Sequence, residues 1–121
     1  MEFMQIPSST SHIIDKKYNA YKNTVAENNI SIVETNKLDN IVTDNIVKGI
    51  KMDVEGAEID AILGAKETLL SNKPKLNIAL YHKFTDIFEI PLLIHEINPD
   101  YRFHIRRHPY IPCWDMNLYC E

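Results

Sequence analysis

The chain has 121 residues, of which 45% are hydrophobic and 25% are charged, and its formal net charge is −4. These values are typical of one soluble globular domain, and an acidic balance without a long run of Lys or Arg disfavours nucleic acid as a partner. The sequence has neither a signal peptide nor an apolar run of the about 20 residues that span a membrane, so we expect a cytoplasmic protein without a membrane partner.

The first thirty residues give little indication of regular structure. Residues 1–29 are polar and rich in Ser, Asn and Lys, so we expect a poorly structured N-terminal segment, with a helix around residues 16–27 as its candidate element. The β-branched "ISIVE" (30–34) predicts a strand, and "LDNIV" (38–42) predicts a short helical turn. The folded domain is therefore expected to span residues 30–121.

A strand followed by a helix is the clearest pattern in the chain. "IVKGIKMDV" (46–54) predicts a buried strand, and from Glu55 onward the apolar residues recur with helical spacing. Pro74 ends this helix and is expected to hold Lys73 in extended geometry. The next strand is "LNIALYH" (76–82). The apolar stripe of the helix comprises Ile59, Ile62, Leu63, Leu69 and Leu70.

The C-terminal third adds one helix and two strands. "TDIFEIPLLIHEI" (85–97) predicts a helix, but Pro91 is compatible with a helix only in its first turn, so the regular part is expected to begin near Ile90. "YRFHIR" (101–106) and "MNLYC" (116–120) alternate with the two-residue period of half-exposed strands. We therefore predict an α/β fold, in which parallel strands end in an antiparallel pair and helices lie on the faces of the sheet.

The two cysteines, Cys113 and Cys120, do not have the spacing of zinc ligands. A disulfide between them is one reading of the sequence. Reduced thiols are the expected state, because the chain carries no secretion signal.

Three acids, Asp53, Glu55 and Glu58, gather where the first strand of this pattern meets its helix, and the next strand ends in His82 and Lys83. Ligands of open α/β sheets bind outside the carboxyl ends of parallel strands, so we expect these side chains to face one cleft. Structural roles remain open, because Glu58 also suits a helix cap and His82 a hydrogen-bonded structural histidine. Asp53 is harder to explain without a partner or ligand, because a carboxylate at the end of an apolar strand loses hydration.

At these residues the chain resembles the FkbM-type methyltransferases, which are S-adenosylmethionine-dependent enzymes with a Rossmann-like class I fold. The resemblance begins near "LDNIV" and continues through "IKMDVEGAEIDAILGAKETL", "KPKLNIALYHKFTDIFEIPLLIHEINPDYRFHIRRH" and "NLYC", which is roughly two thirds of the chain. It implies that "IKMDV" is the fourth strand of the methyltransferase sheet and "LNIALYH" the fifth. The closing antiparallel pair would then be the sixth and seventh strands.

The resemblance also implies roles for the acidic junction. Members of this family commonly methylate a hydroxyl of a sugar or secondary metabolite, so a small-molecule or glycan acceptor is expected. Asp53 would orient the acceptor or act as base, Glu55 and Glu58 would line the site or set the helix, and His82 would take part in general acid–base catalysis. The sequence supplies no clear set of metal ligands, so no metal is assigned.

The chain departs from the family pattern at the cofactor. A class I methyltransferase holds S-adenosylmethionine with a glycine-rich loop after its first strand, but the three glycines here, Gly49, Gly56 and Gly64, form no such motif. Residues 30–121 therefore resemble the C-terminal half of the domain, and the cofactor-binding residues remain unassigned. We expect the isolated chain to bind S-adenosylmethionine weakly and to be inactive by itself.

Two classes of function remain. One is a methyltransferase that needs a missing N-terminal half, and the other is a non-catalytic remnant or interaction module that keeps the second half of the fold. Without a first strand, residues 46–54 would form an open sheet edge protected by little more than Lys48 and Lys51. We expect this edge to promote self-association or to be covered by the strand at residues 30–34.

Overall fold

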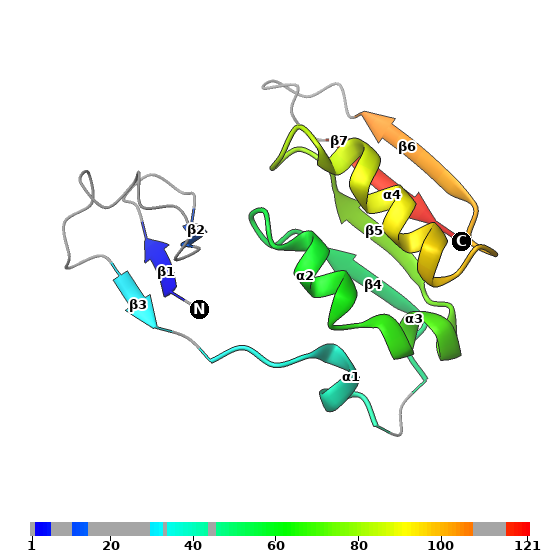
Figure 1. Ribbon diagram of the computed structural model, residues 1–121, viewed down its shortest axis with the longest axis horizontal. Helices are drawn as coiled ribbons and strands as arrows, with labels where there is room; N and C mark the ends of the chain where they lie inside the picture. Colours follow the sequence, from blue (N-terminus) through cyan, green and yellow to red (C-terminus); the bar gives the residue numbers. More distant parts are fainter. Residues whose placement is uncertain (1, 6–10, 15–29, 33, 44–45, 108–115) are drawn as a thin grey trace. The chain divides into compact units, whose positions relative to one another are not determined.

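The structure is a computed structural model that describes residues 2–5, 11–14, 30–32, 34–43, 46–107 and 116–121. The chain divides into two compact units, Met1–Thr35 and Asn36–Glu121 (Figure 1). The first unit contains the strands β1 (Glu2–Gln5), β2 (Ser11–Ile14) and β3 (Ile30–Ile32). They form an antiparallel sheet in the order β2-β1-β3.

Strand β3 lies where the sequence predicts a strand, whereas β1 and β2 lie in the segment for which it predicts little structure. Each of these two strands has only four residues, too few to display a clear two-residue period. Their backbone groups are satisfied by pairing with distant residues, which a local pattern does not reveal. The predicted helix around residues 16–27 lies outside the described residues, as does Cys113.

The second unit contains a four-stranded sheet with helices. Its strand order is β4-β5-β7-β6, in which β4 and β5 are parallel, while β7 is antiparallel to both β5 and β6. This confirms the predicted α/β fold, and β4 forms one edge of the sheet. The elements are α1 (Leu38–Ile41), β4 (Gly49–Met52), α2 (Glu58–Leu63), α3 (Lys66–Asn72), β5 (Lys75–Ala79), α4 (Asp86–Ile97), β6 (Phe103–Arg107) and β7 (Met116–Cys120).

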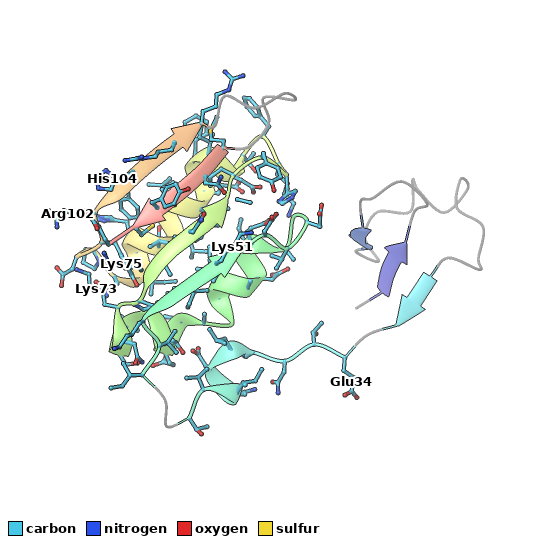
Figure 2. The ribbon with its side chains drawn as sticks, turned by 180° about the vertical axis from the view of Figure 1, so that it is seen from behind. Glu34, Lys51, Lys73, Lys75, Arg102 and His104 are labelled. Carbon is cyan, nitrogen blue, oxygen red and sulfur yellow. The ribbon has the colours of Figure 1, made fainter. Side chains whose placement is uncertain are left out.

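The core lies between the sheet and helices α2, α3 and α4, which cover one of its faces (Figure 1). The strand register places Met52 opposite Ile78 and Ile78 opposite Leu118, and all three side chains are buried. Alternate residues point to the other face, where Lys51 and Lys75 are exposed (Figure 2). Burial of one face fixes the register of β4 against β5, and therefore fixes where their carboxyl ends meet.

The single helix predicted after β4 is two helices, α2 and α3, separated by Gly64 and Ala65. The backbone N–H of Asp39 donates to Gly64 O at 3.0 Å, and the Asp39 carboxylate accepts from the backbone N–H groups of Glu67 and Thr68 at 3.0 and 2.9 Å. These contacts give α3 a start of its own, because they satisfy N–H groups of its first turn. A residue 28 or 29 positions away supplies them, so the helical period alone did not indicate the break.

The prediction for Lys73 is wrong, because this residue is left-handed, with φ 44° and ψ 56°, rather than extended. Tertiary contacts around Pro74 outweigh the local preference of a residue before proline. The Tyr101 hydroxyl donates to Pro74 O at 2.8 Å, and the Lys73 Nζ lies 5.8 Å from the centroid of the Tyr101 ring. Both contacts hold the end of α3 against the chain that precedes β6.

The position of Pro91 also differs from the prediction, because α4 begins at Asp86 and Pro91 lies inside it, past the first turn. The helix start is fixed by a reciprocal pair, in which Lys83 N–H donates to Asp86 Oδ2 at 2.9 Å and Asp86 N–H donates to Lys83 O at 3.1 Å. Burial of Ile90 and Ile94 offsets the hydrogen bond that proline cannot make. None of the helices within the described ranges is long and apolar enough to cross a membrane.

Candidate active site

A tight turn carries the chain from β4 into α2. Glu55 and Gly56 both have left-handed backbones, with φ 54° and 93°, and Ala57 N–H donates to Val54 O at 3.2 Å. Glycine adopts such a φ without strain, whereas a non-glycine residue there costs about 1–2 kcal/mol. Lys83 Nζ donates to Gly56 O, so a side chain that follows β5 braces the turn. Strained residues held in this way are common at functional sites, which makes the turn a candidate.

His82 follows β5 and lies at the centre of a group of carboxylates. Its Nδ1 is 2.8 Å from Glu58 Oε1. Its Nε2 is 3.4 Å from Glu55 Oε2 and 3.6 Å from Asp53 Oδ1. Because β4 and β5 are parallel, the segments that follow them meet at the same edge of the sheet. One imidazole therefore contacts acids from the end of β4, from the turn and from α2.

The two sides of the imidazole differ in their access to water. On the Nδ1 side, the Glu58 side chain is 1% exposed, and its Oε1 also accepts from Val54 N–H at 3.0 Å. On the Nε2 side, the Asp53 and Glu55 side chains are 37% and 31% exposed. The His82 side chain is itself 11% exposed. Its Nδ1 therefore contacts a buried carboxylate, whereas its Nε2 faces two carboxylates that are partly exposed to solvent.

Tyr81 orients Asp53. Its hydroxyl donates to Asp53 Oδ1 at 2.8 Å, and its ring is tilted 53° against the His82 ring with a centroid separation of 4.4 Å. The other carboxylate oxygen of Asp53 is 3.9 Å from Lys51 Nζ. The Asp53 carboxylate is therefore held from two sides while it remains partly open to solvent.

Asp86 is a second buried carboxylate beneath the site. It is 1% exposed, and it accepts from the backbone N–H of Lys83 at 2.9 Å. Burial raises the pKa of Asp86, and the negative charge of Glu58 raises it further. Asp86 fixes the segment that carries His82 and Lys83, because its hydrogen bond joins that segment to the start of α4.

The structure brings Asp53, Glu55 and His82 together at the carboxyl edge of the sheet, as the strand pattern predicts. Glu58 joins them, and its Oε1 lies 2.8 Å from His82 Nδ1 while it also accepts from the Val54 N–H before α2 at 3.0 Å. The catalytic roles of these residues stay predictions. Tyr81 also belongs to the site, although the sequence did not lead us to predict it. The one signal in the sequence that could have indicated Tyr81 is its position directly before His82.

Two kinds of ligand can be tested against the described residues. Within these ranges, no group of three His, Cys, Asp or Glu side chains has an arrangement that could hold a metal ion. For a sulfonium donor, Asp53 and Glu55 place negative charge beside the site, which suits the methyl end of the molecule. The described residues do not include a set that would hold its nucleoside, so we assign no donor-binding residue.

The family model for the Methyltransferase FkbM domain matches residues 3–108. The chain belongs to the FkbM methyltransferase family. The match begins well before "LDNIV", and it includes the three acids that contact His82, namely Asp53, Glu55 and Glu58. Membership of this family implies a methyl donor such as S-adenosylmethionine.

A solved structure supports the same assignment. The chain is similar to the methyltransferase FkbM from Methylobacillus flagellatus KT, with 39% sequence identity and a TM-score of 0.65. The match covers 70% of this chain and 22% of that protein, so the chain spans about a fifth of the length of this FkbM relative. Comparison with curated proteins gave no match.

Proposed function

We propose that the chain forms the acceptor side of an S-adenosylmethionine-dependent methyltransferase that methylates a hydroxyl oxygen of a small molecule or glycan. One observation carries the proposal: His82 Nε2 faces Asp53 and Glu55 at 3.6 and 3.4 Å, at the carboxyl edge of parallel strands. Family membership supports the reaction class.

The arrangement supplies what methylation of a hydroxyl requires from the protein. When bound, the donor provides the methyl group as an electrophile. As the new oxygen–carbon bond forms, the carbon–sulfur bond of the donor would break and its thioether would leave. His82 Nε2 would take the proton that the acceptor oxygen loses. Asp53 and Glu55 accept hydrogen bonds from hydroxyl groups, so they orient the acceptor and stabilise the imidazolium that results.

The partly exposed carboxylates of Asp53 and Glu55, which form the rim of the site, favour an acceptor rich in hydroxyl groups. Asp53 and Glu55 offer acceptor oxygens, and the Tyr81 hydroxyl already shares one of them at 2.8 Å. A polyhydroxylated molecule such as a sugar presents several O–H donors to such a rim. Its neighbouring hydroxyl groups would therefore fix which oxygen reaches His82 Nε2.

A chimera tests the proposal, because the chain corresponds to only part of its solved relative. The chain replaces the matched part of the M. flagellatus protein, and transfer of a radiolabelled methyl group to a panel of sugars and hydroxylated small molecules is measured. We expect His82→Gln and Asp53→Asn to lower transfer by about 10²-fold, the usual contribution of a positioned base. The matched control is Asp60→Asn on α2, an exposed acid of the same region, which should leave transfer unchanged.

The opposite result is equally clear. Full transfer by the His82→Gln chimera would remove the proton acceptor from the proposal. The non-catalytic alternative instead predicts that the chimera with the wild-type chain transfers no methyl group.

A further inference from the structure

We propose that Glu58 is a positioning residue that holds His82 in the tautomer with its proton on Nδ1, leaving Nε2 free to accept a proton. This deepens the proposed function, since it assigns the group that selects the nitrogen facing the acceptor. Glu58 itself touches neither acceptor nor donor in this account.

The hydrogen bonds of Glu58 fix the direction of the contact. Its Oε1 lies 2.8 Å from His82 Nδ1 and 3.0 Å from Val54 N. An ionised carboxylate can only accept, so both nitrogens must present a hydrogen to it. The Val54 amide always does so, and His82 does so only when Nδ1 is protonated. The same contact therefore anchors Oε1 and selects the tautomer.

Burial makes the contact of Glu58 with His82 Nδ1 stronger than the contacts of the other two acids with Nε2. Glu58 is 1% exposed, whereas the acids near Nε2 are 37% and 31% exposed, and their distances to that nitrogen exceed 3.2 Å. A charge-assisted hydrogen bond is stronger where water is excluded. The Nδ1 side therefore decides where the proton of a neutral ring resides.

The remaining polar groups around the ring do not supply a competing partner for Glu58. Its Oε2 is buried and has no hydrogen-bond partner among the described residues. Asp86 lies nearby as another buried acid, and Glu58 acts on it by repulsion. Lys83 directs its ammonium to Gly56 O. Within the described residues, His82 and the Val54 amide are thus what offsets the burial of the Glu58 carboxyl.

A purely structural role for Glu58 is the alternative, because the bond to Val54 N–H alone would help to close the turn before α2. The substitution Glu58→Gln separates the two roles. Glutamine keeps an oxygen for the Val54 amide, but its amide group can also donate to Nδ1. A structural role predicts no change in the ring, whereas a positioning role predicts a change of tautomer.

Nitrogen NMR of the imidazole rings measures the tautomer directly in the ¹⁵N-labelled 121-residue chain. Spectra are recorded at about pH 8.5, above the usual histidine range, and the His82 ring is identified by its loss in His82→Gln. The wild-type ring should show a protonated Nδ1 and an unprotonated Nε2. In Glu58→Gln, the ratio of the two tautomers should shift toward Nε2–H by about tenfold or more, as expected for loss of a charged hydrogen bond. Asp60→Asn, which removes an exposed charge from the same helix, should leave the ratio unchanged.

Several results would overturn the proposal. A wild-type ring that carries its proton on Nε2, or on both nitrogens, contradicts it without any variant, so the test survives even if Glu58→Gln fails to fold. An unchanged ratio in folded Glu58→Gln contradicts it as well. The measurement uses no methyl donor, so its outcome is separate from the transfer assay that tests the proposed function.

Discussion

Replacing Asp39 with alanine should remove the cap of α3 and lower the free energy of unfolding by about 2–3 kcal/mol. Asp39 Oδ2 accepts from Glu67 N–H at 3.0 Å, while Oδ1 accepts from Thr68 N–H at 2.9 Å and from the Thr68 hydroxyl at 2.7 Å. Glu67 is exposed, so water can replace its lost partner. Thr68 is 4% exposed, so its two donors lose theirs, and each unsatisfied buried group costs about 1–3 kcal/mol, less whatever entering water returns.

The pH dependence of this loss gives a second check. Burial acts against the ionised form of Asp39, but the hydrogen bonds from Glu67 and Thr68 and the charge of Lys37 outweigh it, so its pKa lies below the ordinary value of 3.8. An acid with a lowered folded-state pKa stabilises the fold above its ordinary pKa, and this contribution is lost as the pH falls through the folded-state pKa. The difference between wild type and Asp39→Ala should therefore be full near neutral pH and should shrink below about pH 4.

Urea unfolding of the wild type, Asp39→Ala and Asp60→Ala measures these effects. Asp60 is an exposed acid of α2, and its replacement should change stability by about 0.5 kcal/mol or less. A loss below about 0.5 kcal/mol for Asp39→Ala would refute the capping argument. So would a loss that is the same at acidic and neutral pH.

Three further outcomes follow from glycine, tyrosine and cysteine residues of the second unit. Gly56→Ala should destabilise the fold by about 1–2 kcal/mol in urea unfolding, because φ is 93° there, whereas Gly49→Ala at an ordinary φ should have little effect. Burial, followed by the electrostatic effect of Cys120, raises the pKa of Tyr101 to about 12. The free energy of unfolding should therefore be constant below pH 10.0, the ordinary pKa of tyrosine, and should fall as the pH rises toward 12. An ultraviolet titration that shows Tyr101 ionising near pH 10.0 in the folded chain would contradict this. Burial also raises the pKa of the Cys120 thiol to about 12. In a Cys113→Ser variant, which leaves Cys120 as its one cysteine, the thiol should react with Ellman's reagent only when the chain unfolds. Rapid labelling of the folded variant would be inconsistent with the burial of Cys120.

Local patterns predicted the second unit well where they coincide with its core. Strand β7 lies at residues 116–120 as predicted, and Ile62 and Leu69 of the predicted apolar stripe are fully buried. Leu63 and Leu70 of the same stripe are instead 49% and 46% exposed. Ile62 and Leu69 are seven residues apart, as are Leu63 and Leu70, so both pairs keep the helical period across the break, and the buried face is narrower than the predicted stripe.

The features that sequence reasoning missed depend on contacts between distant residues. The start of α3 depends on Asp39, and the left-handed Lys73 depends on Tyr101. Pro91 is tolerated inside α4 because the buried face of that helix offsets the missing hydrogen bond. A local propensity has no access to any of these partners.

The candidate site shows the same division. The strand ends placed Asp53 and His82 at one edge, because the direction of parallel strands follows from their connection through a helix. The pattern did not distinguish a capping role for Glu58 from a contact with His82, since both need only an acid at the start of α2. In the structure Glu58 makes both kinds of contact, because its Oε1 lies 2.8 Å from His82 Nδ1 and also accepts from Val54 N–H at 3.0 Å.

The position of the donor relative to His82 tests most directly whether this edge of the sheet is the active site. A crystal structure of the chimera with S-adenosylhomocysteine, the demethylated form of the donor, would reveal the position of the sulfur in its electron density. We expect the sulfur to lie at the carboxyl edge of β4 and β5, on the side of the ring where His82 Nε2 faces Asp53. A sulfur at the opposite edge of the sheet, beside Lys75, or one separated from His82 by the backbone of the turn at Gly56, would contradict the assignment of this edge as the active site.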